Sequence, residues 1–246
     1  MELQIYDITL LIVGLLNLTM AVGLLAKTRT YRQYPVYRRS LCLTAVFFAV
    51  FGIGMLLHFH FQWRMSYPLL ATALSVSYFH ISGVFINWSH TSLLNPHYLG
   101  RKVLLRDIPL LAVGIPAYWI TATSCPLSTF HYTLLIFLVH CVFMAFDFYT
   151  TYFRVSRRLI AMQQGSVEGF MRWMLRSCHL IIAFGLGSIM FTSFFPVDAW
   201  PFTALLIVGA MVFVYIYFSL CEYGHVIHRT TIATSDANDV SWHFSR

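Results

Sequence analysis

The residues best suited to chemistry are polar side chains that recur at helical spacing inside long apolar runs. His80, Asn87 and His90 follow one another at intervals that place them on one face of a helix. His140 and Asp147 share a face in a later run. Such groups either hydrogen-bond helices together or form a polar cavity or a protonation-sensitive histidine–carboxylate switch. The full candidate set is His80, Asn87, His90, His140, Asp147, His179, Tyr215, Ser219 and Glu222.

Asp147 is the residue of this set whose burial in a membrane needs the most explanation. An unpaired charged aspartate in the middle of a bilayer costs roughly 2.5–3.5 kcal/mol on insertion scales. We therefore expect Asp147 to have a partner or to be protonated in at least one state. The expected partners are His80, His90 or His179.

A second group of histidines lies near the opposite side of the predicted membrane. The stretch "LLHFHFQW" contains His58 and His60 and is followed by Arg64, which is typical of a membrane–water boundary. We expect both rings to point toward water or headgroups. The alternative is a metal site that combines one of them with His131, although zinc or copper needs three or four ligands.

Composition is typical of an integral membrane protein. Hydrophobic residues make up 59% of the 246 positions, charged residues only 10%, and the mean hydropathy is +0.70. A soluble domain carries about 25% charged residues. The five cysteines do not form a disulfide pattern, and most lie in apolar runs, where we expect them to pack as small apolar residues.

Hydropathy divides the chain into seven segments of membrane-spanning length, which requires about 20 residues. We predict an all-α membrane protein, a seven-transmembrane helix bundle within residues 1–228, followed by a flexible cytoplasmic tail at 229–246. The predicted spans are 6–26, 40–62, 67–94, 108–124, 129–153, 174–195 and 200–222.

Basic residues gather on alternate links between these spans. Residues 27–39 carry five Lys or Arg, residues 95–107 carry three, and residues 154–176 carry five arginines. Because such links stay in the cytoplasm, we predict an outside N-terminus and a cytoplasmic C-terminus. The net charge of +7 then lies beside anionic lipid headgroups, which are the expected partners, and no direct nucleic-acid contact is expected.

Several function classes are excluded or weakened by particular residues. A retinal pigment needs a lysine in the seventh span, whereas the only lysines are Lys27 and Lys102, both in basic links. A haem site needs histidine pairs at matched depth, and His80 with His140 is the only rough candidate. The sequence contains no Walker motif, HExxH motif or nucleophile elbow.

Three stretches resemble the N-terminal membrane regions of bacterial membrane-anchored AraC-type (helix-turn-helix) regulators. They are "YPVYRRSLCLTAVFFAVFGIGMLLH", "SRRLIAMQQGSVEGFMRWMLRSCHLIIAFGLGSI" and "VYIYFSLCEYGHVIH". The resemblance covers nearly the whole chain and rests on the placement of arginines and aromatic residues. It implies a multi-pass sensor followed by a cytoplasmic output domain. No DNA-binding domain precedes Arg246, so we expect a stand-alone or truncated sensor.

The sequence therefore predicts a sensor or receptor-like module of the bacterial inner (plasma) membrane, without a cofactor or enzymatic activity of its own. A shift of the last two spans would carry the signal to a cytoplasmic partner or output domain. The expected partners are a small ligand and a cytoplasmic signalling protein, and the pattern allows a homodimer. The competing hypothesis is a metal- or haem-binding membrane enzyme that uses the intramembrane histidines.

Overall fold

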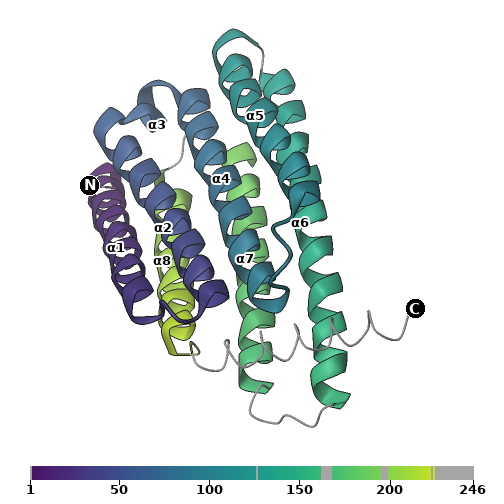
Figure 1. The fold of residues 1–246 in the computed structure, drawn as a ribbon. Coiled ribbons are helices and arrows are strands. Elements are labelled where there is room, and N and C mark those ends of the chain that lie inside the picture. The colour runs from purple at the N-terminus through teal and green to yellow at the C-terminus, as the bar shows by residue number, and fades with distance from the viewer. Residues whose placement is uncertain (1, 126, 162–167, 195–198, 223, 225–246) are drawn as a thin grey trace.

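The structure is a computed structural model that describes residues 2–125, 127–161, 168–194, 199–222 and 224. All regular secondary structure in these ranges is helical, and the predicted tail at 229–246 lies outside them. The helices are α1 (Glu2–Thr30), α2 (Pro35–Phe61), α3 (Trp63–Ser66), α4 (Pro68–Leu94), α5 (Arg101–Ser124), α6 (Leu127–Ala161), α7 (Glu168–Phe194) and α8 (Ala199–Glu222), as Figure 1 shows.

Every helix except the short α3 is long and apolar enough to cross a membrane, which confirms the predicted seven spans. The chain is therefore a multi-pass membrane protein by helix length and composition. Its outer surface agrees, because large apolar side chains such as Ile12, Val113 and Val142 are more than half exposed. An apolar surface of this kind is stable in contact with lipid and unfavourable in contact with water.

Several helices extend beyond the predicted apolar segments, because hydropathy assigns their basic end turns to links. α5 begins at Arg101 rather than at residue 108, and α6 runs to Ala161, beyond its predicted end. Helical backbone hydrogen bonding continues through these charged turns. The correction at α5 matters most, because it places Arg106 and Asp107 inside a helix rather than in a loop.

A short break separates α2 from α4. Gln62 takes a left-handed conformation with φ of 51°, which ends α2. The four-residue helix α3 follows, and it was not predicted because four residues carry no detectable periodicity. Pro68 then begins α4, as Pro35 begins α2, since proline fits the first turn of a helix without losing a hydrogen bond.

Helix α4 is the shared wall of the bundle. It packs against α2 on one side and against α5 and α6 on the other, an arrangement visible in Figure 1. Helix α1 packs against α2 and α8, and α7 packs against α8 and more lightly against α4. Contact between α6 and α7 is sparse. The bundle thus has a tightly joined half around α1, α2 and α8 and a looser half around α5, α6 and α7.

Glycine brings the helices of the tight half close together. A Cβ atom at Gly52 would lie 2.9 Å from the backbone oxygen of Gly14 on α1. A Cβ atom at Gly54 would collide with the ring of Tyr78 on α4. These positions therefore require glycine because neighbouring atoms fill the space that a side chain would occupy.

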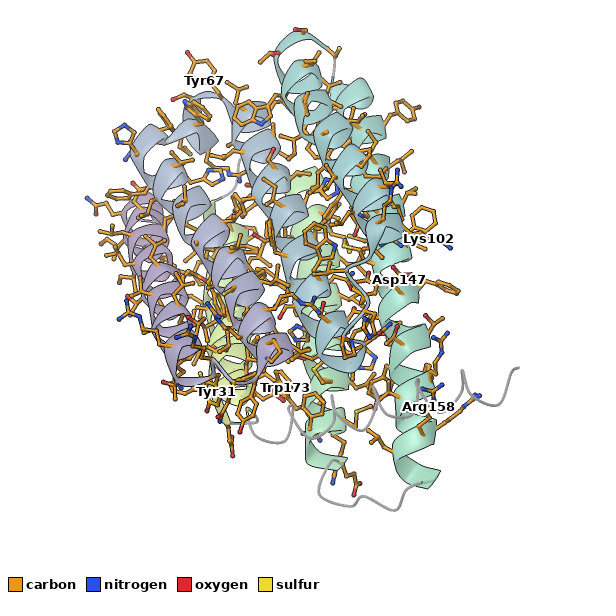
Figure 2. All side chains as sticks on the ribbon, in the orientation of Figure 1. Tyr31, Tyr67, Lys102, Asp147, Arg158 and Trp173 are labelled. Atoms are coloured by element: carbon orange, nitrogen blue, oxygen red, sulfur yellow. The ribbon has the colours of Figure 1, made fainter. Side chains whose placement is uncertain are left out.

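The link at residues 95–100 turns back along α4 before α5 begins (Figure 1). Asn87, about two turns before the end of α4, donates a 3.0 Å hydrogen bond to the hydroxyl of Tyr98 in this link. The charged first turns of α5 consequently lie beside α4. Figure 2 shows Lys102 and Asp147 between the two ends of the bundle, which Tyr67 and Arg158 mark.

Candidate functional site

Two predicted histidines meet in the interior between α4 and α6. His80 Nε2 lies 2.8 Å from His140 Nδ1, and His140 Nε2 lies 3.0 Å from Oδ1 of Asp107 on α5. On the far side, the hydroxyl of Tyr118 lies 3.0 Å from His80 Nδ1. All four side chains are buried. The result is an unbroken hydrogen-bonded chain that joins three helices.

The carboxylate of Asp107 anchors this chain. It accepts 2.6 Å hydrogen bonds from Arg106 Nε and from Trp88 Nε1, in addition to the bond with His140. Three donors that converge on one carboxyl group, one of them a guanidinium, favour its ionised form. Asp107 is therefore an acceptor only, which fixes the direction of every bond behind it.

The proton positions follow from this anchor. Because Asp107 accepts, His140 carries a proton on Nε2, and in a neutral ring Nδ1 is left to accept. His80 must then donate from Nε2 to His140, so that its own Nδ1 accepts from the hydroxyl of Tyr118. Both histidines are neutral Nε2–H tautomers in this arrangement, and every donor points toward Asp107.

The chain continues from Arg106 toward the surface. Arg106 Nη1 donates a 2.6 Å hydrogen bond to Oδ2 of Asp147 on α6, and Tyr98 donates a 2.9 Å bond to the same oxygen. Burial, reinforced by the Asp147 carboxylate, raises the pKa of Tyr98, so its hydroxyl remains a donor. Asn87 donates to Tyr98 in turn. We call the connected set the polar relay: Tyr118, His80, His140, Asp107, Arg106, Asp147, Tyr98 and Asn87.

One end of the polar relay is open and the other is closed. The side chains of Arg106 and Asp147 are 26% and 23% exposed, whereas Tyr118 at the other end is fully buried. Arg106 and Asp147 face an open hollow of mixed polar and apolar lining between α5 and α6. We call this hollow the vestibule; it is lined by Tyr98, Lys102, Val103, Arg106, Asp147, Thr150, Thr151 and Arg154.

Four predicted site residues belong to the polar relay, namely His80, Asn87, His140 and Asp147. Asp147 does have a partner, but the partner is Arg106 together with Tyr98 rather than a histidine. The expectation was wrong on this point because it left Arg106 in a cytoplasmic link. With α5 extended to Arg101, the guanidinium reaches the carboxylate directly.

Sequence reasoning missed half of the relay: Arg106, Asp107, Tyr98 and Tyr118. One signal could have found the first two. Asp107 is the only acidic residue in the basic stretch 95–107, and it follows Arg106 directly. An acid among basic residues is expected to pair within the protein rather than face anionic headgroups.

Two predicted histidines lie apart from the relay. His90 is buried on α4, and its Nε2 lies 3.1 Å from the hydroxyl of Ser177 on α7, which ties these two helices together. His179 is exposed on α7, with its ring 5.8 Å from that of Tyr149 on α6. Neither contacts Asp147 directly.

The predicted residues of the last span also lie elsewhere. Tyr215 is partly buried and packs against the apolar core, and Ser219 is buried. Glu222 is exposed at the end of α8. Among the described residues, none of the three hydrogen-bonds to a member of the polar relay.

The histidines of "LLHFHFQW" have different surroundings. His58 was expected to point toward water, but it is only 3% exposed and its Nε2 lies 2.9 Å from the hydroxyl of Ser75 on α4. The correction has a steric reason: α3 folds over the end of α2 and α4 and places Arg64 beside the same Ser75 hydroxyl, at 3.2 Å. His60 and His131 are exposed.

The described residues do not support a metal or haem site from these histidines. In the ranges that the structure describes, no group of three or more His, Cys, Asp or Glu side chains is placed to hold a metal ion. His80 and His140 bond each other directly at 2.8 Å, which leaves no space for a haem between their rings.

The chain was compared with protein-family models, curated proteins and solved structures, and none of them matches it. The site must therefore be understood from its own geometry: a buried, directional hydrogen-bonded chain that opens at one end to a charged vestibule.

Proposed function

We propose that this protein is a sensor or receptor-like module of the bacterial inner membrane and that the polar relay is its switch. The observation that carries the proposal is the continuous chain from Tyr118 to Asp147, closed at one end and open at the other. Intramembrane ionisable groups are expensive and are commonly functional. The bond between His80 and Tyr118 can take either direction, depending on whether His80 carries one proton or two, so this end of the chain has two states.

The charges of the relay leave room for one proton. Asp107 and Asp147 share the single cation of Arg106, so the group carries one negative charge when both histidines are neutral. Arg106 also has one buried nitrogen, Nη2, without a hydrogen-bond partner among the described residues. The arrangement is thus neither charge-balanced nor saturated, and a second arrangement is within reach.

A proton gained by the histidine pair would reverse the far end of the relay. His140 keeps its bond to Asp107, and one N–H stays between the two rings. The extra proton then appears on His80 Nδ1, which must donate to the oxygen of Tyr118 instead of accepting from it. Tyr118 then has to rotate its hydroxyl toward a new acceptor. A proton that enters at the vestibule therefore changes the hydrogen bonding of a buried residue of α5.

Helix α4 offers a route from the relay to the output. Asn87 is the relay's last member, and His90, one turn further along α4, bonds Ser177 on α7. Helix α7 packs against α8, which leads to the C-terminal residues. A displacement of α4 would therefore reach the last two spans, consistent with output to a cytoplasmic partner or domain of the kind that the AraC-type resemblance implies.

The switch is tested by measuring movement between α6 and α7. Spin labels replace the exposed Phe153 on α6 and Arg172 on α7 in a cysteine-free protein. A control pair replaces Val22 on α1 and Val46 on α2, in the tight half. Pulsed dipolar spectroscopy in nanodiscs compares the two distance distributions at neutral pH with those at acidic pH.

We expect the α6–α7 distance distribution to change with pH while the control pair stays constant. The change should disappear in His80→Gln, which keeps a polar side chain but cannot carry the extra proton. A distance distribution that ignores pH would contradict the switch. A change that persists in His80→Gln would place the switch outside the relay.

We also propose the orientation on which this function depends. Basic residues favour a cytoplasmic position for the links at 27–39, 95–107 and 154–176, where they also meet anionic headgroups. Reporter fusions after Arg39 and Arg158 should be cytoplasmic, and fusions after Met65 and Cys125 outside. The reverse pattern would place the vestibule on the outer side of the membrane and would contradict the sensor proposal.

A further inference from the structure

A second feature lies beside the relay, in the looser half of the bundle. An apolar cavity of about 250 Å³ lies between α2, α4, α6, α7 and α8. Apolar cavities of about 150 Å³ bind benzene, and sites for drug-sized ligands begin at roughly 300 Å³. The cavity therefore suits a medium-sized apolar molecule. Its wall includes Phe51, Phe79, Phe137, Phe184, Ile189 and Phe213.

The mouth of the cavity faces the bilayer. Val142 on α6 and Leu186 on α7 line the cavity and are also 68% and 47% exposed on the outer surface of the bundle. They lie where α6 and α7 make only sparse contact. A molecule dissolved in the membrane can enter between these two helices without crossing water.

One side of the cavity is polar but uncharged. Among the described residues of its lining, only Asn87 and His90 on α4 have a side-chain nitrogen or oxygen that can form a hydrogen bond. The same part of the chain contributes no Lys, Arg, Asp or Glu to the cavity. An occupant with a charged group would be buried there without a counter-ion, at high cost. An occupant with one uncharged hydrogen-bonding group would find a partner in the amide of Asn87.

We infer that this cavity is a binding site for a lipophilic molecule of medium length with one uncharged hydrogen-bonding end, such as a fatty alcohol. The hydrocarbon part fills the aromatic wall, and the polar end meets Asn87. Asn87 donates to Tyr98, which donates to Asp147, so occupancy acts directly on the polar relay. A role for this ligand as the signal rests on the proposed sensor function. Binding of the ligand in the cavity does not depend on that function.

Two glycines of α7 provide a matched pair of variants. Gly185 lines the cavity, and a Cβ atom there would meet nothing within 4 Å. Gly187 has the same free space but does not line the cavity. Residues two apart on a helix point about 200° away from each other. Gly185→Leu therefore fills the cavity, whereas Gly187→Leu adds the same side chain to the same helix outside it.

The experiment is photolabelling of the full chain in nanodiscs. The probe is octan-1-ol with a diazirine in its chain, and mass spectrometry locates the label. We expect labelled peptides from α4, α6 and α7, a loss of that label by at least tenfold in Gly185→Leu, and no change in Gly187→Leu. Excess decan-1-ol should compete, and decane should compete at least tenfold less well.

Each other outcome overturns a defined part of the inference. Equal labelling of both variants, spread over lipid-facing residues, would show that the cavity is not a binding site. Equal competition by decane and decan-1-ol would show that the ligand needs no hydrogen-bonding end. If Gly185→Leu does not fold, Gly83→Leu fills the cavity from α4, where a Cβ atom would meet only Met144 at 3.8 Å. Labelling of the cavity without any pH-dependent movement between α6 and α7 would support the binding site and contradict the proposed sensor function.

Discussion

The two sides of α4 hold their neighbours by different means. On the α2 side, the hydroxyl of Ser89 lies 2.6 Å from that of Ser40 and 2.7 Å from that of Thr44, and glycines allow close approach. On the α5–α6 side, His80 and Asn87 join a chain of titratable groups that ends in an open vestibule.

The difference separates a fixed half from an adjustable half. The hydroxyls of Ser40, Thr44 and Ser89 carry no charge and have no second protonation state near neutral pH, so this contact with α2 does not depend on pH. The polar relay carries one more negative than positive charge, its His80–Tyr118 bond can reverse, and the apolar cavity beside the relay leaves space for movement. In the proposed switch, α4 therefore provides both a rigid support and the surface that responds.

The largest effect is expected from removing the anchor of the relay. Asp107→Leu leaves Arg106, Trp88 and His140 without their shared acceptor. Breaking a buried charge pair costs about 3–5 kcal/mol. Denaturant or thermal unfolding in detergent should show a loss of this order, while Glu222→Leu, at an exposed carboxylate, changes little. Equal stability of Asp107→Leu and the parent would contradict the anchor.

The next effect probes the fixed half. Gly54→Ala forces a methyl group against the ring of Tyr78, and overpacking of this kind costs typically about 1–3 kcal/mol. Gly83→Ala, on the cavity side of α4, meets only Met144 at 3.8 Å and should be neutral or slightly stabilising. Unfolding curves of the two variants decide the matter. Similar stability for both would show that the two sides of α4 are packed alike.

Substitution of Asp147 should change stability less, but it should have a large effect on the pH-dependent movement between α6 and α7. Asp147→Asn retains an acceptor for Tyr98 and should cost on the order of 1 kcal/mol. It removes the excess negative charge of the relay, so the pH-dependent movement between α6 and α7 should vanish. Asp147→Leu removes the acceptor as well and should unfold more easily. A normal pH response in Asp147→Asn would leave only a structural role for this carboxylate.

The smallest effect is expected from a single hydroxyl of the fixed half. Ser89→Ala removes the bonds to Ser40 and Thr44, and side-chain hydrogen bonds between membrane helices contribute about 0.6 kcal/mol on average. Unfolding should shift by about that amount, and the pH response of α6 and α7 should remain. A lost pH response would show that the fixed half takes part in the switch.

The sequence was sufficient to predict the number of spans and much of the relay's interior face. Hydropathy identifies apolar helices directly, and helical spacing placed His80 with Asn87 and His140 with Asp147. Both pairs lie in the relay. These predictions succeed because they depend only on local periodicity and on the cost of polar groups in a bilayer.

The contribution of α5 could not be predicted in the same way. Arg106 and Asp107 are charged residues next to a basic link, so hydropathy assigned them to the cytoplasm. Their position depends on the link at residues 95–100, which turns back along α4 and sets the depth at which α5 begins. That depth is a tertiary property. The burial of His58 under α3 is another.

The account is tested most directly by nitrogen-15 spectra of the histidines in oriented proteoliposomes. At neutral pH, His80 and His140 should both be Nε2–H tautomers, with a through-bond coupling between His80 Nε2 and His140 Nδ1. Acid added on the C-terminal side alone should protonate this coupled pair and shift its signals. Uncoupled histidine signals, or a pair that responds only to acid on the opposite side, would contradict the proposal that the relay opens to the cytoplasm.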